Sequence, residues 1–208
     1  MGLQFAVDKR VFIPRPETET LVEQVMMKCN QRTGGEESHI LDVGTGSGNI
    51  AVSLAKLVRK AQITSIDRSV QALDVAQSNA RSHGVVSNIT FVNANFFEPS
   101  ELHFPEQFDF LVSNPPYVSI QEWQDLDPEV RQFEPKLAVS DQNDGYEFYR
   151  HIGAVAGKFV RKGGWVIVEV GHGQSERVSE LFRAASFSEI SVVNDLQEVP
   201  RVVLGRCS

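Results

Sequence analysis

The chain has 208 residues, 41% hydrophobic and 23% charged, which is enough for one domain with a substantial core and hardly enough for two. Its formal net charge is −7 and it has no block of lysine and arginine, which disfavours a protein that grips nucleic acid through phosphates. No apolar run approaches the roughly 20 residues that span a bilayer, and the first residues form neither a signal-peptide core nor an arginine-rich helix.

The cysteines and histidines predict no metal site. Cys29 and Cys207 lack CxxC spacing, and the five histidines show no ligand spacing. Free thiols indicate a reducing compartment. The expected location is the cytoplasm if the source is bacterial and the mitochondrion if it is eukaryotic. We expect a monomer with no membrane partner and no stable nucleic-acid partner.

The N-terminal stretch begins with an irregular segment and continues as a helix. Residues 4–13 alternate loosely, which predicts a hairpin or an extended arm that ends at Pro14 and Pro16. Glu17 and Glu19 suit the first turn of the helix that follows. Apolar residues then recur at helical spacing, at Leu21, Val22, Val25 and Met26.

The polar, glycine-rich stretch 31–38 predicts a loop. We expect it to separate an N-terminal arm and helix (residues 1–38) from the main body (residues 39–208), in which strands and helices alternate. Strands are expected at 39–43, 62–66, 89–92, 108–112, 165–170, 189–193 and 199–204. Helices are expected at 49–59, 70–83, within 145–161, and at 174–185. This pattern predicts an α/β fold with a mostly parallel seven-stranded sheet, helices on both faces and an antiparallel final pair.

A glycine-rich turn joins the first predicted strand to the first helix of the main body. It consists of Gly44, Thr45, Gly46, Ser47 and Gly48. Glycines permit a sharp turn and close approach of a ligand to the helix N-terminus. The dinucleotide pattern GxGxxG would need glycine where Asn49 stands. The shorter GxGxG loop is typical of S-adenosylmethionine enzymes; the alternative is a tight turn that merely needs glycines.

An acidic residue closes the second predicted strand. Asp67 follows Gly48 by 19 residues, where an acid can accept both hydroxyls of a ribose. The alternative is a helix N-cap, which Asp67 or Ser69 would serve equally well.

The fourth predicted strand runs into Asn114, Pro115, Pro116 and Tyr117, the most specific signal in the chain. Two prolines stiffen a turn at the carboxyl end of the sheet. The Asn114 side-chain oxygen and the Pro115 carbonyl can each accept one hydrogen of an NH2 group, and Tyr117 can stack on a planar group. These residues predict methylation of a poorly nucleophilic amide or amine nitrogen, achieved by positioning and electrostatics.

Together these motifs resemble the amino-methyltransferases with an NPPY motif. The segment Phe12–Glu19 (FIPRPETE) narrows the likeness to the HemK/PrmC-like release factor glutamine methyltransferases, which the sequence resembles over nearly its whole length. Further matches are Phe133-Glu134-Pro135, Asp144-Gly145, Glu169-Val170-Gly171 with Gln174, and Arg201-Val202-Val203.

The resemblance implies a Rossmann-like class I methyltransferase fold and S-adenosylmethionine as cofactor. It implies N5-methylation of the glutamine in the Gly-Gly-Gln motif of class I peptide chain release factors. Asn114 and Pro115 would hold that glutamine, while Arg15 and Glu17, with Pro16, would wall the substrate entrance.

The sequence departs from the family at three places. Asn95 stands where the family has an acid, and would bond the adenine without charge, with Phe96 against the ring. Glu198 replaces a glycine in the loop before Arg201. The family also has a helical domain before the PRPETE segment, which helps to recruit the release factor, whereas this sequence starts almost at that segment.

Two other functions compete with glutamine methylation. One is adenine amino-methylation of nucleic acid, which the acidic charge and the PRPETE segment disfavour. The other is a catalytically weak module that binds cofactor or a partner, a reading that Asn95 and the short N-terminal part motivate.

Overall fold

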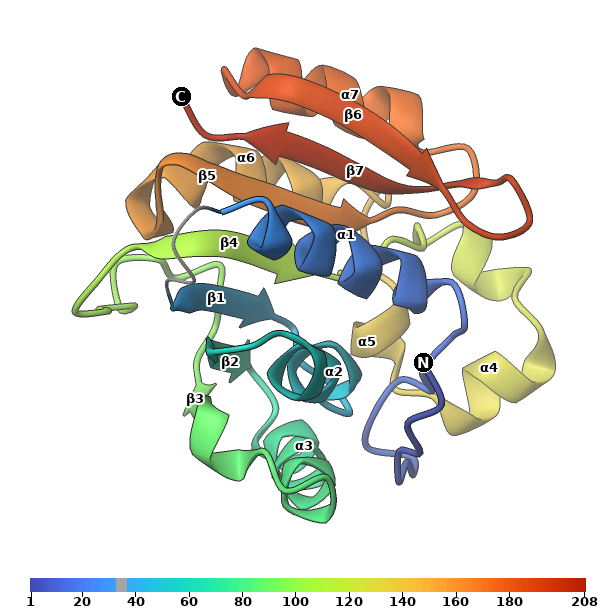
Figure 1. The fold of residues 1–208 in the computed structure, drawn as a ribbon. Coiled ribbons are helices and arrows are strands. Elements are labelled where there is room, and N and C mark those ends of the chain that lie inside the picture. The colour runs from blue at the N-terminus through green and yellow to red at the C-terminus, as the bar shows by residue number, and fades with distance from the viewer. Residues whose placement is uncertain (33–36) are drawn as a thin grey trace.

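The computed structural model describes residues 1–32 and 37–208. Its centre is a seven-stranded sheet with the order β3-β2-β1-β4-β5-β7-β6 (Figure 1). The strands are β1 (Ser38–Val43), β2 (Ala61–Asp67), β3 (Ile89–Asn93), β4 (Phe108–Ser113), β5 (Val160–Glu169), β6 (Ser188–Asn194) and β7 (Pro200–Arg206). β7 runs antiparallel to β5 and β6, and the other pairs are parallel. The predicted α/β fold is confirmed.

Helices cover both faces of the sheet (Figure 1). They are α1 (Thr18–Asn30), α2 (Asn49–Leu57), α3 (Val70–Ser82), α4 (Pro128–Phe133), α5 (Lys136–Val139), α6 (Glu147–Phe159) and α7 (Ser175–Ala184), with 3-10 turns at Val86–Asn88 and Glu122–Gln124. α1, α2 and α3 lie on one face, and α6 and α7 on the other. Neighbouring strand residues serve opposite layers: Ile40 packs in the first core and Leu41 in the second.

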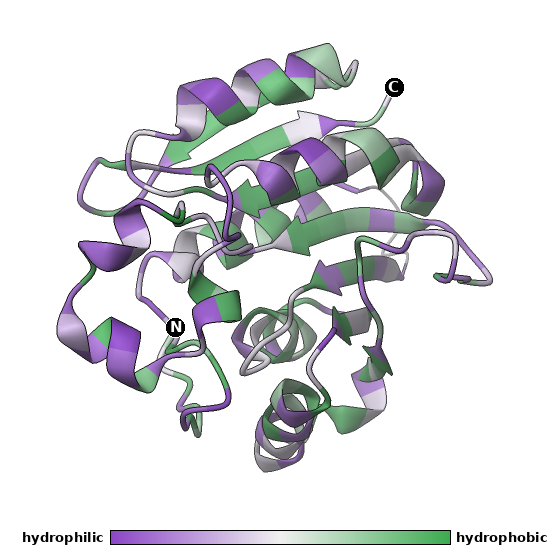
Figure 2. Cartoon of the chain, turned by 180° about the vertical axis from the view of Figure 1, so that it is seen from behind, coloured by the Kyte–Doolittle hydropathy of each residue, from purple (hydrophilic) through white to green (hydrophobic). Residues whose placement is uncertain are grey.

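The hydrophobic pattern follows these layers. Figure 2 shows mostly hydrophobic strands in the middle of the sheet and mixed surfaces on the helices, as expected for strands buried on both faces. Leu21, Val22 and Val25 of α1 enter the same core as Ile50 of α2. No helix in the described part of the chain has the length and apolarity needed to cross a membrane.

The structure refines several expected elements. Residues 4–13 form an extended arm and no strand, and Asn79 of α3 holds the arm by accepting from Ala6 N at 2.9 Å and donating to Ala6 O at 3.0 Å. β5 begins at Val160, five residues before the predicted start, because a polar segment containing Gly163 and Gly164 continues the strand. The short helices α4 and α5 were not predicted. Part of the loop expected at 31–38, namely 33–36, lies outside the described residues.

The strand order places the predicted motifs together. β1 has β2 on one side and β4 on the other, so the chain changes direction across the sheet at β1. Ligands of open α/β sheets bind in the crevice beyond the carboxyl ends of strands at such a point. The glycine loop leaves β1 there, and Asn-Pro-Pro-Tyr leaves β4 beside it.

Candidate active site

The glycine loop bends back on the end of β2. Gly44 N donates to Ile66 O at 2.9 Å. Gly44 and Gly48 have φ angles of 74° and 79°, in the left-handed region that favours glycine. A Cβ on Gly44 would meet nothing within 4 Å, whereas one on Gly48 would lie 2.9 Å from the Cβ of Ala76. Gly44 therefore leaves open space beside the backbone, and Gly48 allows α2 to pack against α3.

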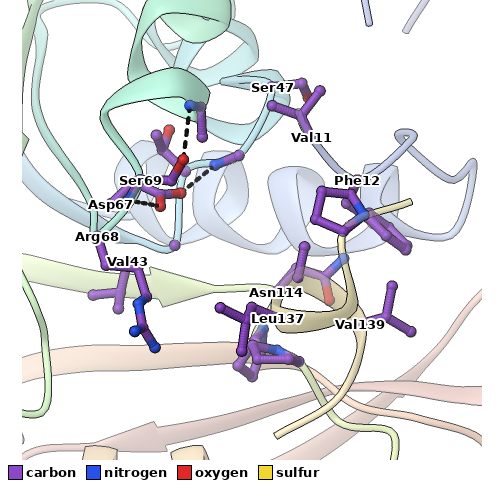
Figure 3. A pocket seen from close by; sticks show the side chains of 18 of the residues that line it. Val11, Phe12, Val43, Ser47, Asp67, Arg68, Ser69, Asn114, Leu137 and Val139 are labelled. Carbon is purple, nitrogen blue, oxygen red and sulfur yellow. Dashed lines mark hydrogen bonds between the residues drawn. The ribbon is translucent and has the colours of Figure 1, made fainter. Parts of the chain in front are cut away.

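Asp67 anchors the other side of this loop (Figure 3). Its Oδ2 accepts from Gly46 N at 3.0 Å and its Oδ1 from Ser69 N at 2.9 Å. Burial raises the pKa of this carboxyl group, while the two backbone hydrogen bonds oppose the rise. Ser69 is the N-cap of α3, since its Oγ accepts from Ala72 N at 3.2 Å. Asp67 thus keeps acceptor capacity on both oxygens, because each carboxylate oxygen takes more than one hydrogen bond.

A cavity of about 570 Å³ lies between the glycine loop, Asp67 and the turn after β4, a size typical of sites for small ligands. Most residues predicted for the site line it: Arg15, Gly44, Thr45, Gly46, Ser47, Asp67, Asn95, Phe96, Asn114, Pro115, Pro116 and Tyr117. Gly48 and Glu17 do not line it. Apolar side chains complete the wall, among them Val11, Phe12, Leu137 and Val139 (Figure 3).

The turn after β4 presents Asn114 to this cavity. Ser113, fully buried, donates from its Oγ to Val43 O at 2.8 Å and fixes the end of β4 against β1. The Nδ2 of Asn114 donates to the Thr18 hydroxyl oxygen at 3.3 Å. No donor among the described residues reaches the Oδ1 of Asn114, so that oxygen remains available as an acceptor.

Tyr117 is held as a neutral ring in the wall. Burial, and secondarily the charge of Glu169, raise its pKa to about 12. Its backbone carbonyl accepts from Gln174 Nε2 at 2.9 Å. A Cβ on Gly145 would lie 2.6 Å from the same carbonyl oxygen, so the loop before α6 comes close to this turn only with glycine there.

A buried carboxyl group lies behind Asn114. Glu169, the last residue of β5, is 1% exposed, and its Oε2 has no hydrogen-bond partner. Burial raises its pKa to about 7, against the lowering effects of the Thr18 hydroxyl, the positive charge of Arg201 and the Asn114 amide. Asn114 thus has a titratable group behind it.

The PRPETE segment reaches the cavity through Arg15. Arg15 forms an ion pair with Glu134, whose side chain is almost fully buried. The other oxygen of Glu134 accepts from Ile13 N at 3.3 Å, and the Arg15 guanidinium lies 4.6 Å from the centre of the Phe12 ring. Glu134 thereby joins the N-terminal arm to the segment between α4 and α5.

At the other end of the cavity, Asn95 is engaged locally. Its Nδ2 donates to Glu98 Oε1 at 2.7 Å and its Oδ1 accepts from Phe97 N at 3.2 Å. Phe96 is 5% exposed and packs edge-on against His151. Phe97 stacks on the same imidazole at 4.5 Å between ring centres and also lines the cavity.

Several residues of this region were missed as site residues. Phe97 and Phe148 line the cavity, and Thr18 contacts Asn114. Glu169 and Gln174 were noticed only as family matches without a role. A signal for both existed in their positions, because Glu169 lies at the end of a predicted buried strand and Gln174 follows shortly after it, and the carboxyl ends of parallel strands meet at one edge of a sheet.

Comparison with known proteins agrees with this geometry. Residues 35–143 match the family described as a methyltransferase domain. Among solved structures, the catalytic domain of human Mettl16 aligns with a TM-score of 0.74 at 16% identity, covering 100% of this chain and 76% of that one. A human methyltransferase 10 domain containing protein aligns with a TM-score of 0.71 at 16% identity, covering 99% and 90%. Both show a shared fold.

Sequence relatives give a narrower assignment. A release factor glutamine methyltransferase of Geobacter sulfurreducens is 39% identical over 99% of this chain and 69% of its own length. One of Chlorobaculum tepidum is 41% identical over 96% of this chain and 68% of its own length. With the glycine loop, Asp67 and the Asn-Pro-Pro-Tyr turn on one cavity, this likeness shows that the chain belongs to the release factor glutamine methyltransferase family.

Proposed function

We propose that this chain transfers the methyl group of S-adenosylmethionine to the N5 nitrogen of the glutamine in the Gly-Gly-Gln motif of a class I release factor. One observation carries the proposal: Asn114 lines the same cavity as the glycine loop and Asp67, and its Nδ2 is engaged by Thr18, which leaves its oxygen as the acceptor for a substrate. A methyl donor and a planar amide can therefore meet in one space of suitable size.

The residues present fit the cofactor. The open space at Gly44 and the free amides at the start of α2 suit the amino-acid end, and Asp67 retains acceptors for both ribose hydroxyls. Asn95 and Phe96, with the unpredicted Phe97, line the end where the adenine would lie. When bound, S-adenosylmethionine supplies an electrophilic methyl group on a positively charged sulfur.

The turn after β4 suits the amide substrate. An amide nitrogen is a weak nucleophile because its lone pair is delocalised into the carbonyl group. The Oδ1 of Asn114 and the carbonyl of Pro115 can each accept one of its hydrogens, while the neutral ring of Tyr117 offers a stacking surface. Positioning of this kind contributes at best about 7 to 11 kcal/mol to lowering a barrier. The bond from the methyl group to sulfur would break as the bond to nitrogen forms, and the surplus proton on nitrogen would pass to water afterwards, so no strong base is needed before the attack.

The PRPETE segment forms part of the entrance in this proposal. Arg15 lines the cavity and forms an ion pair with Glu134, and Glu17 is the residue that immediately precedes α1. Residues 1–38 would act as the entrance segment and residues 39–208 as the catalytic domain, working as a monomer in the bacterial cytoplasm or in a mitochondrion. We propose that neither nucleic acid nor a membrane is a stable partner.

Mass spectrometry of a purified class I release factor after incubation with the protein and S-adenosylmethionine tests the proposal. We expect one added methyl group on the Gly-Gly-Gln glutamine, and none when that glutamine is changed to alanine. Asn114→Ala should reduce turnover by at least about 100-fold with cofactor binding retained, as for other lost groups that stabilise a transition state. Equal turnover of Asn114→Ala and wild type would contradict the mechanism. Methylation of DNA or RNA instead would contradict the substrate.

A further inference from the structure

Three polar side chains connect the buried end of β5 with the cavity. Glu169 is buried and does not line the cavity. Thr18, the first residue of α1, is 2% exposed; its hydroxyl, and more weakly the Asn114 amide itself, act on Glu169 as hydrogen-bonding groups that lower its pKa. On its other side Thr18 accepts from the Nδ2 of Asn114 at 3.3 Å. Asn114 alone of the three lines the cavity.

The protonation state of Glu169 decides the direction of these hydrogen bonds. A carboxylate is an acceptor only, whereas a hydroxyl group both donates and accepts. When Thr18 donates its one hydrogen to ionised Glu169, it can only accept from Asn114. The NH2 group of Asn114 is then turned toward Thr18, and its Oδ1 faces the cavity. Without the carboxylate, Thr18 could donate to Oδ1 equally well, and the amide could turn over.

We propose that Glu169 is a positioning residue for methyl transfer, whose carboxylate fixes the orientation of the Asn114 amide both directly and through the Thr18 hydroxyl. The inference rests on the proposed function, in which the Oδ1 of Asn114 receives a hydrogen of the substrate amide. A reversed amide would present two hydrogens to the substrate NH2 group and repel it.

The surroundings of Glu169 let it change its charge near neutral pH. Arg201 of β7 favours the ionised form, Glu17 before α1 disfavours it, and Tyr117 remains neutral. The Tyr149 hydroxyl of α6 donates to the backbone carbonyl of Glu169 at 2.9 Å, and not to the Glu169 carboxyl group. The Oε2 atom therefore has no partner, and burial places the pKa at about 7. The oriented form is lost as the pH falls through this value.

The pH profile of kcat tests the inference. For the wild-type protein with a release factor as substrate, we expect kcat to fall tenfold per pH unit below about pH 7. Glu169→Gln should lower kcat at pH 8 by about 10- to 100-fold, as for groups that orient a ligand elsewhere, and remove the acid limb with little change in KM. The exposed Glu101→Gln is the matched control and should keep the limb. An unchanged acid limb in Glu169→Gln would overturn the inference.

The Thr18 hydroxyl gives a second, conservative comparison. Thr18→Ser keeps the hydroxyl group and Thr18→Val keeps the shape, so kcat should be at least tenfold higher in Thr18→Ser. Equal activity of these two variants would show that the hydroxyl does not carry the orientation.

A measurement without any substrate separates this inference from the proposed function. The side-chain NH2 resonances of Asn114 in 15N-labelled protein should shift with an apparent pKa near 7. They should stay constant in Glu169→Gln, and their shift should be smaller in Thr18→Val than in the wild type. If the chemical shifts of these resonances do not change with pH in the wild type, the positioning role is wrong, even if methyl transfer occurs. If the resonances titrate but the protein does not methylate a release factor, the positioning role is supported and only the proposed substrate is rejected.

Discussion

The side-chain amide of Gln174 donates a hydrogen bond to the backbone carbonyl of Tyr117, 2.9 Å away. Its oxygen accepts from Gly171 N at 3.0 Å. A single buried side chain therefore ties the loop after β5 to the turn after β4. A Cβ on Gly171 would lie 2.9 Å from the Tyr117 ring, so the two loops touch only because that residue is glycine. The turn that presents Asn114 is thus braced from outside the cavity.

Replacing Gln174 should loosen this brace. Gln174→Ala leaves the Tyr117 carbonyl and the Gly171 amide without their partner, which costs about 1 to 3 kcal/mol in a buried setting. We expect the free energy of unfolding to fall by that amount and kcat to fall by about tenfold, with the cofactor Kd nearly unchanged. Urea denaturation, steady-state kinetics and calorimetry measure the three quantities. The exposed Gln124→Ala should change none of them; a loss of cofactor affinity in Gln174→Ala would argue against a brace confined to the turn.

Asp67 should act on cofactor affinity. Asp67→Ala removes two acceptor oxygens that we assign to the ribose hydroxyls, and hydrogen bonds to charged groups contribute about 1.5 to 3 kcal/mol. The Kd for S-adenosylmethionine should therefore rise by at least about tenfold in isothermal titration calorimetry. Asp74→Asn, on the exposed side of α3, changes an acid nearby and should leave the Kd unchanged. An unaltered Kd in Asp67→Ala would refute the ribose role.

Glu169 should make stability depend on pH. Its pKa rises from an ordinary value of 4.5 to about 7 on folding, because burial disfavours the charge. Below pH 4.5 the group is protonated in both states; between pH 4.5 and 7 the unfolded chain releases a proton that the folded chain keeps. The stability present at low pH is therefore lost as the pH rises through 7, by about 3 kcal/mol.

Glu169→Gln removes the ionisation and should recover most of this loss. We expect its free energy of unfolding at pH 8 to exceed that of the wild type by up to about 3 kcal/mol, and the gain to disappear below about pH 5. Urea denaturation at the two pH values gives the comparison, with Glu101→Gln as control. A variant less stable than the wild type at pH 8 would show that the carboxylate is not a net cost to the fold.

Glu198 is a place where the backbone is strained. It has a φ angle of 60° in the turn between β6 and β7, where Asp195 Oδ1 accepts from Gln197 N and Val199 N at 2.9 and 3.0 Å. The left-handed conformation costs a residue with a Cβ about 1 to 2 kcal/mol, part of which glycine returns through its freedom in the unfolded chain. Glu198→Gly should therefore stabilise the protein by about 0.5 to 1 kcal/mol in thermal unfolding. Glu198→Ala keeps the Cβ and should bring no such gain.

The strands and long helices were predictable because their patterns are local. β1 and β4 are short, mostly apolar segments that are buried almost throughout, as strands covered on both faces are, and α3 carries a serine cap. β5 was harder, because its first residues are polar and include Gly163 and Gly164. The short helices α4 and α5 carry no periodicity long enough to recognise.

The cavity lining was predictable where a residue stands in a motif at a strand end, as Asp67 and Asn114 do. Contacts between segments that are distant in sequence have no local motif that predicts them. Thr18 has the pattern of an ordinary helix residue, and only the fold places it beside Asn114, 96 residues away. The local engagement of Asn95 by Glu98 and Phe97 also depends on a turn that composition does not specify.

The position of β7 between β5 and β6 has a consequence for the order of folding. The ribosome makes β6 before β7. Since β7 is the strand that pairs with β6, β6 has no neighbour in the sheet until residues 200–206 have emerged and paired with both β5 and β6. β7 also supplies Val202 and Leu204 to one hydrophobic layer and Val203 to the other. The half of the sheet that carries the glycine loop and Asn114 can assemble during synthesis, whereas the half with α7 and β6 must wait.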